Sequence, residues 1–174
     1  PDPMLLPENY QGQEPYDDCV NFICEKFDEA AKGLPATRTG AQANEFGLAT
    51  SVVAKAMKAK MLLYAASPLF NGNSKFYSDF KDKSGNALMP LTYDATKWQK
   101  AADAFKEAIA AAESAGYHLY DRGDCKLNKN GFPADPHVRA LRYTITDYSA
   151  EDEPAGANPE VIWADSRGEG YYGL

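Results

Sequence analysis

Apolar residues recur at helical spacing in three segments of this chain, residues 16–32, 49–67 and 96–115. Within each segment they stand three or four positions apart, which places them on one side of an α-helix. The stripe of the first segment contains Val20, Ile23, Cys24, Phe27, Ala30 and Ala31, and it continues to Leu34 just beyond the segment. The stripe of the third segment contains Trp98, Ala101, Ala102, Phe105, Ala108, Ile109 and Ala112. We therefore predict three helices, with Trp98 in the core.

Residues with known preferences for helix ends delimit these segments. Pro15 suits the first position of a helix, and Pro68 stops the second segment. In the third segment, Thr96 and Gln99 fit a capping box, and Gly116 is a natural C-cap residue. The boundaries of all three helices are thus set by local sequence.

The middle segment is apolar around most of its circumference and has small residues at Ala54, Ala56, Ala59, Ala65 and Ala66. A helix of this kind is usually central in its bundle. The first and second helices start about 33 residues apart, close to a tetratricopeptide period of about 34. We therefore predict stacked helical hairpins, with residues 71–92 as a long insertion between the second and third helices.

The rest of the chain has a different pattern. Residues 121–136 are rich in Asp, Asn, Gly and Lys, which is typical of a surface loop. Residues 141–148 favour β structure, and residues 161–163 form a short apolar run that is either a strand or a buried extended segment. The predicted fold class is an all-α, tetratricopeptide-like helical hairpin bundle with long loops and minor β structure at the C-terminal end.

We expect residues 1–174 to form a single partial domain. Residues 16–116 are its helical core, and residues 117–174 are loop-rich and form the expected ligand side. Residues 1–10 show no basic segment followed by an apolar one, and no apolar stretch reaches the length of a membrane span. We therefore interpret the sequence as a mature or excised piece.

Charge and cysteine content exclude some functions. The chain has 18 Lys and Arg against 25 Asp and Glu, a net charge of −7 that disfavours nucleic acid as a partner. Cys19, Cys24 and Cys125 form neither a disulfide framework nor a zinc motif, so we expect free thiols. No metal or cofactor is predicted, and the cysteines leave the redox compartment open.

Four segments, in order, resemble the SusD/RagB family. Residues 48–73 resemble its Lys- and Ala-rich helix leading into Leu-Leu-Tyr-Ala-Ala-Ser-Pro-Leu-x-Asn-Gly. Residues 93–120 are similar to its Trp-x-x-Ala-Ala helix followed by Gly-Tyr-x-Leu-Tyr. Residues 27–35 resemble its Leu-Pro helix ending, and residues 158–163 resemble its Asn-x-Glu-Val-Ile stretch. The matched positions in the two helical segments are Tyr64, Ala65, Ser67, Pro68, Asn71, Gly72, Trp98, Ala101, Ala102, Gly116, Tyr117, Leu119 and Tyr120.

The sequence departs from the family in places. Leu48 follows Gly47 where the family usually has Gly-Arg, so the role of that arginine is missing or relocated. The family's lipobox cysteine and its C-terminal part are also absent, so the resemblance covers part of a full-length member.

The resemblance implies a function at a bacterial outer membrane. Members are surface-exposed, lipid-anchored, non-enzymatic proteins that capture oligosaccharides or polysaccharides. They deliver this cargo to a SusC-like TonB-dependent transporter, against which the helical repeat packs. The expected partners are therefore a glycan, that transporter and the missing remainder of the same protein.

Sugar binding requires exposed aromatic side chains beside polar groups, because pyranose rings stack on aromatic faces while their hydroxyls form hydrogen bonds. The C-terminal segment offers this combination and lies where the family's ligand residues commonly fall. Its candidate glycan-binding residues are Trp163, Asp165, Arg167, Tyr171 and Tyr172. Because Trp163 follows an apolar pair, a core position is the alternative interpretation for it.

Other side chains have plainer interpretations. Tyr64, Tyr117 and Tyr120 are expected to be packing residues first, and the isolated His118 and His137 are expected to be structural or surface residues. No set of catalytic residues stands out, so an enzyme is not predicted. Two alternatives remain open. The chain could be a helical-repeat protein-interaction module without a sugar site, or it could be a glycan-active enzyme.

Overall fold

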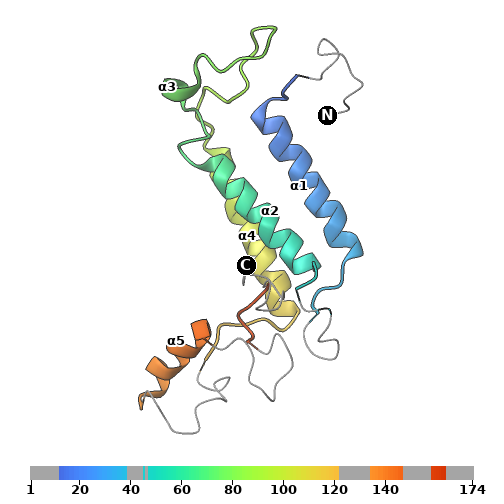
Figure 1. The fold of residues 1–174 in the computed structure, drawn as a ribbon, viewed down its shortest axis with the longest axis vertical. Helices are drawn as coiled ribbons and strands as arrows, with labels where there is room; N and C mark the ends of the chain where they lie inside the picture. Colours follow the sequence, from blue (N-terminus) through green and yellow to red (C-terminus); the bar gives the residue numbers. More distant parts are fainter. Residues whose placement is uncertain (1–11, 39–44, 46, 122–133, 147–157, 164–174) are drawn as a thin grey trace, which may run out of the picture.

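The computed structural model describes residues 12–38, 45, 47–121, 134–146 and 158–163 (Figure 1). Its helices are α1 (Tyr16–Gly33), α2 (Ser51–Ala66), α3 (Ser74–Tyr77), α4 (Thr96–Ser114) and α5 (Pro136–Thr146). Across these ranges, the only β pairing is an isolated antiparallel bridge between Lys81 and Ala87. The predicted all-α helical bundle is confirmed, and the three predicted helices match α1, α2 and α4 to within two residues at each end.

Helix α2 lies between α1 and α4 and contacts both, as its apolar circumference predicted (Figure 1). Its contact surface is built from small side chains, since Ala59 and Ala66 have no exposed area. The opposing row on α4 is also alanine, at Ala101, Ala104, Ala108 and Ala112. Small residues at a contact let two helix axes approach closely, so α2 and α4 form one tightly packed hairpin.

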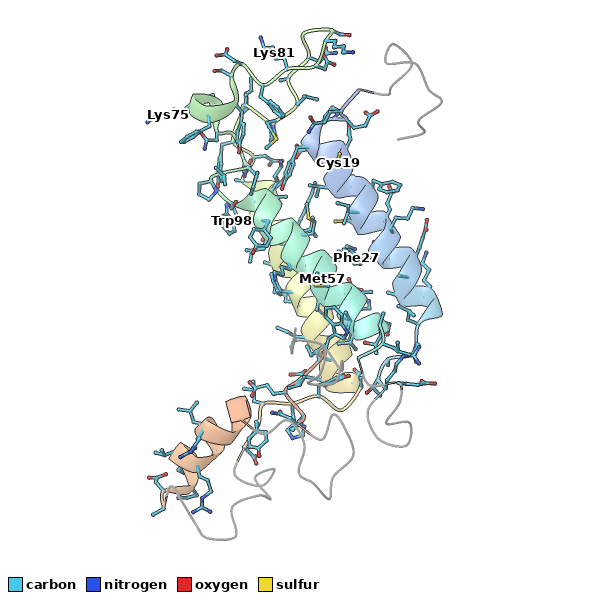
Figure 2. The ribbon with its side chains drawn as sticks, viewed as in Figure 1. Cys19, Phe27, Met57, Lys75, Lys81 and Trp98 are labelled. Atoms are coloured by element: carbon cyan, nitrogen blue, oxygen red, sulfur yellow. The ribbon has the colours of Figure 1, made fainter. Side chains whose placement is uncertain are left out.

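A second row of apolar residues on α4 lies outside this contact. Trp98 is 41% exposed and Ile109 is 56% exposed, so the predicted core position of Trp98 is wrong for the described chain. At 3.6 residues per turn, Trp98 lies roughly 60° around the helix from Ala101. Figure 2 shows Trp98 on the side of the hairpin away from α1, whereas Phe27 lies between α1 and α2.

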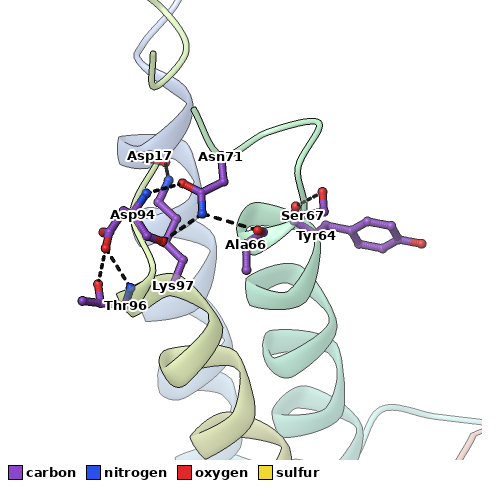
Figure 3. Close-up of polar contacts among 8 residues, drawn as sticks. All are labelled: Asp17, Tyr64, Ala66, Ser67, Asn71, Asp94, Thr96 and Lys97. Carbon is purple, nitrogen blue, oxygen red and sulfur yellow. Dashed lines mark hydrogen bonds and ion pairs between the residues drawn. The ribbon is translucent and has the colours of Figure 1, made fainter. Parts of the chain in front are cut away.

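The tyrosines divide in the same way. Tyr117 and Tyr120 are buried, which confirms them as packing residues. Tyr64 is 53% exposed and points away from the bundle, so its predicted packing role is wrong (Figure 3).

The corner between α2 and α4 is closed by the amide of Asn71, which is buried (Figure 3). Its Nδ2 donates to the carbonyl oxygens of Ala66 at 3.4 Å and Asp94 at 2.8 Å, and its Oδ1 accepts from the Asp94 N–H at 2.9 Å. Because one side chain satisfies groups at the end of α2 and just before α4, it fixes how the two helices meet.

Helix α4 begins differently from the prediction. Asp94 Oδ1 accepts hydrogen bonds from the Thr96 N–H at 2.8 Å and the Thr96 hydroxyl at 2.7 Å, and this holds the pKa of Asp94 below its usual range. Gln99 donates to Asp103 at 2.9 Å, so the predicted capping box is wrong. An aspartate two residues earlier satisfies the same backbone group more directly.

The C-terminal end of α4 is a Schellman motif at the predicted glycine. Gly116 has φ +93°, its N–H donates to Glu113 O at 3.0 Å, and the Tyr117 N–H donates to Ala112 O at 3.0 Å. Tyr117 then packs with Ala112 in the core. This is the hydrophobic contact that usually accompanies the motif.

The minor β structure predicted near the C-terminal end is wrong in the described residues. Most of the segment 141–148 lies in α5, which starts with Pro136 at its first position. Asp135 Oδ1 accepts from the backbone N–H groups of His137 at 2.8 Å and Val138 at 3.2 Å. This local cap overrides the β propensity of the segment. Residues 161–163 are irregular, with a bend at Ile162 and no strand pairing, and most of the predicted loop 121–136 lies outside the described residues.

None of the described helices is long and apolar enough to cross a lipid bilayer.

Gly72→Ala should destabilise the protein much more than Gly85→Ala. Both glycines have a positive φ, +80° and +88°, so each substitution costs about 1–2 kcal/mol of backbone strain. A Cβ at Gly72 would also lie 2.3 Å from the Tyr93 nitrogen, whereas a Cβ at Gly85 meets nothing within 4 Å. Urea denaturation followed by far-ultraviolet circular dichroism measures both losses, and equal losses would contradict this account of the corner.

Candidate functional site

Three segments meet at the end of the bundle where α2 begins and α4 ends (Figure 1). They are the α1–α2 connection, the stretch that follows α4, and residues 158–163. Val52, Ala112 and Tyr117 form a buried cluster there, and Ile162 packs against it. The short segment 158–163 is therefore anchored on the bundle by its apolar side chain.

Hydrogen bonds fix the other end of segment 158–163. Asn158 is buried, and its Nδ2 donates to Thr144 O on α5 at 3.1 Å. Its Oδ1 accepts from the Glu160 N–H at 3.0 Å. The His118 N–H donates to Pro159 O at 3.2 Å. The segment consequently runs from α5 to the end of the bundle, where Trp163 follows.

Trp163 lies on the surface and is 57% exposed. Its indole Nε1 donates to Gly47 O at 2.6 Å. The polar edge of the ring is thus satisfied by the backbone, while much of the ring remains in contact with solvent. A core position for Trp163 is wrong, and an exposed ring held in one orientation suits stacking.

Two charged side chains are bonded at or near the turn that contains Gly47. Arg38 Nε donates to Ala49 O at 3.2 Å, and its guanidinium forms an ion pair with Glu45. The Leu48 N–H donates to Glu45 O at 3.0 Å, which closes a turn around Gly47. Glu45 is two residues from Gly47, a span of at most about 7 Å. The Trp163 indole is therefore bonded to the same turn that contains Glu45 and its ion pair with Arg38.

This ion pair was missed by the sequence-based prediction, although a signal exists. Arg38 and Glu45 are the only charged residues between Leu34 and Thr50. An isolated opposite pair in a polar connection favours a specific contact. A second contact, between Thr37 Oγ1 and the Tyr117 hydroxyl at 3.2 Å, ties the same connection to the stretch that follows α4.

The other predicted site residues, Asp165, Arg167, Tyr171 and Tyr172, lie outside the described residues. The structure therefore places Trp163 alone of the predicted set.

Segment 158–163 is flanked by two grooves. One, of about 480 Å³, lies against α5 and is lined by Tyr120, Asp121, His137, Thr144 and Glu160, among others; we call it the α5 groove. The other, of about 460 Å³, is mostly apolar and is lined by α2 and α4 residues together with Leu119, Ile162 and, from the shared segment, Glu160, among others; we call it the apolar groove.

A third groove, of about 550 Å³, separates α1 from α4 above the side chains of Lys58 and Leu62. Lys58 Nζ lies 2.7 Å from the Asp28 carboxylate, so α2 is joined to α1 there. Burial raises the pKa of the Cys24 thiol in this groove, which favours the protonated, unreactive form. Among the described residues, no cluster of His, Cys, Asp and Glu has the arrangement to hold a metal ion.

Comparisons with known proteins find a structural relative. No protein-family model matches the chain, and no curated protein matches it. A solved structure of BT4246, from Bacteroides thetaiotaomicron, is similar with 45% identity and a TM-score of 0.57 over 67% of this chain. A selenomethionine form of BT4246 gives 43% identity and a TM-score of 0.53 over 66%.

The chain covers 20% of BT4246 in the first structure and 19% in the second. The likeness therefore concerns about a fifth of that protein, and its name states no function. Over the matched part, the identity and the TM-score together indicate a shared fold.

Arg38→Met should loosen the turn that holds Trp163. The chain has two tryptophans, so Trp98→Phe leaves Trp163 as the single fluorophore, and Trp163→Phe leaves Trp98. Removing the guanidinium removes the bonds to Ala49 O and Glu45, so acrylamide should quench Trp163 fluorescence more strongly. The same substitution in the background that reports Trp98 is the control and should change nothing. Unchanged quenching of Trp163 would show that the ion pair does not position it.

Proposed function

We propose that this chain is a helical part of a SusD/RagB-type lipoprotein that captures oligosaccharides or polysaccharides at the outer membrane without catalysis. Delivery would be to a SusC-like TonB-dependent transporter, with the rest of the same protein completing the structure. The proposal joins the sequence resemblance to the geometry of the end of the bundle that carries Trp163.

The resemblance is supported by the structural roles of the matched residues. Asn71 and Gly72 form the corner between α2 and α4, and the Ser67 hydroxyl donates to Tyr64 O at 2.7 Å at the end of α2. Gly116 and Tyr117 form the C-cap of α4. Each of these residues has a specific structural role that few other residue types can fill. A match to the family pattern at these positions therefore carries more weight than a similar composition.

The observation that carries the sugar-binding proposal is the setting of Trp163. Its ring is exposed, its N–H is bonded to Gly47 O, and a turn bearing the Arg38–Glu45 pair adjoins it. A sugar needs an apolar plane for one face of the ring and charged or polar groups for its hydroxyls. The bond from Trp163 to Gly47 ties the exposed ring to the turn that contains the charged pair, and this supports the proposal.

A non-catalytic role is favoured by the carboxyl groups. A glycosidase needs an acid whose pKa is raised by its surroundings, paired with a second carboxylate at a fixed distance. Among the described residues, the carboxyls with resolved pKa shifts are Asp82, Asp94 and Asp135, and hydrogen bonds donated to them lower all three values. Their chemistry is that of turn and helix caps.

Trp163→Ala should weaken binding of the cognate carbohydrate about tenfold, because a ring stack contributes on the order of 1 kcal/mol beyond the area it buries. Trp163→Phe keeps an aromatic plane and should retain most of the affinity. Trp98→Ala, which removes the other exposed tryptophan, is the control and should bind normally. A glycan array followed by calorimetry measures this, and wild-type affinity in Trp163→Ala would refute the proposal.

A second candidate function, a protein-interaction module without a sugar site, is favoured by the apolar groove. Phe105 and Ile109 line this groove, and the exposed Trp98, two turns before Phe105 on α4, extends the row outside it. Such a row offers spaced apolar contacts of the kind that an amphipathic helix fills. Ile109→Glu would then abolish binding to the purified transporter, and no carbohydrate would bind any variant. Carbohydrate binding that depends on Trp163 would reject this candidate as the sole function.

A further inference from the structure

The α5 groove is assembled from three separate parts of the chain. Tyr120 and Asp121 come from the stretch after α4, His137 and Thr144 from α5, and Glu160 from segment 158–163. Tyr120 is buried, whereas Asp121, His137 and Glu160 are exposed. A concave surface that combines an aromatic side chain with a few polar groups is the usual form of a small-molecule site.

The groove and Trp163 are joined by the same piece of backbone. Glu160 lines the groove, and Trp163 follows it by three residues, a span of at most about 10 Å. Figure 1 shows this segment running from α5 to the end of the bundle. Both ends are fixed, by Asn158 at α5 and by the indole bond to Gly47 at the other end. The two surfaces are therefore held at a constant separation.

The chemistry of the groove selects among sugars. Its described lining includes the exposed carboxylate of Glu160 and no lysine or arginine. Carboxylates accept strong hydrogen bonds from hydroxyl groups. They repel the carboxylate or sulfate groups of acidic sugars, since like charges close together are unfavourable.

We propose that the α5 groove is a second sugar subsite and that the ligand is a neutral oligosaccharide long enough to reach from this groove to Trp163. This inference rests on the proposed function, because it extends the carbohydrate site that Trp163 begins. Affinity rises with chain length until both surfaces are occupied, and acidic oligosaccharides bind poorly.

The test compares neutral oligosaccharides, from disaccharides to octasaccharides, with oligouronides and sulfated oligosaccharides of the same lengths. The variants are Glu160→Gln, which keeps the shape of the side chain, and His137→Ala on the opposite wall. Glu25→Ala, an exposed carboxylate on α1, is the matched control. Isothermal calorimetry gives the affinities, and circular dichroism confirms that each variant is folded.

Glu160→Gln should weaken binding of the long neutral oligosaccharides about tenfold, since a hydrogen bond to a charged group is replaced by a weaker one. Disaccharide binding should stay unchanged, and His137→Ala should show a smaller loss with the same length dependence. Trp163→Ala should weaken binding at every length, which separates the two surfaces.

Wild-type affinity at every length in both Glu160→Gln and His137→Ala would overturn the second subsite. Equal affinity for neutral and acidic oligosaccharides would overturn it as well. If Trp163→Ala still lowers affinity in those cases, the proposed function stands and only the groove assignment fails. If Trp163→Ala has no effect, the proposed function itself fails.

Discussion

The alanine contact between α2 and α4 is the constraint on which the rest of this structure depends. Ala59 and Ala66 on α2 face a row of alanines on α4, and larger side chains there would push the helices apart. The close approach lets Asn71 bond to both Ala66 and Asp94 at one end of the hairpin. At the other end, it brings Val52 of α2 onto Ala112 and Tyr117. Both ends of the hairpin follow from this packing.

The two ends serve different purposes because their connections differ. At the corner after α2, the buried amide of Asn71 and Gly72 at φ +80° restrict the backbone to one conformation. At the opposite end, three segments meet through contacts between a few side chains and the backbone, such as the bond from Trp163 to Gly47. Exposed aromatic and charged groups gather there. Because the corner fixes how α2 and α4 pack, the opposite end of the hairpin can be formed by connecting segments that rest on the two helices.

Much of the fold could be predicted because its signals are local. Helix periodicity, the terminal prolines and Gly116 gave three helices nearly to the residue. The prediction failed where two local signals favour different structures, such as a helix cap beside residues of high β propensity. The Asp135 cap turned a β-leaning stretch into α5, and Asp94 displaced the expected cap at Thr96. Trp98 was wrongly placed in the core because the apolar stripe of α4 contains two rows of residues. The alanine row is buried against α2, and the adjacent row, which includes Trp98 and Ile109, is exposed. Trp163 could be proposed as a ligand residue from the sequence. The turn that contains Glu45 is brought to Trp163 only by the fold, through the bond to Gly47 O.

The two tryptophans show why exposure alone does not define a ligand surface. Trp98 belongs to a row on one side of α4 with Phe105 and Ile109, and a row of spaced apolar residues on a helix suits contact with another helix. Trp163 follows the apolar pair Val161 and Ile162, but a connecting segment carries it, and its N–H is bonded to Gly47 O in a turn that also contains Glu45, the partner of Arg38. A sugar presents an apolar face and hydroxyl groups together, so it matches the second setting and not the first. The two rings therefore differ in the groups that surround them. A helix places Trp98 in an apolar row, whereas a connecting segment places Trp163 beside a turn with charged side chains.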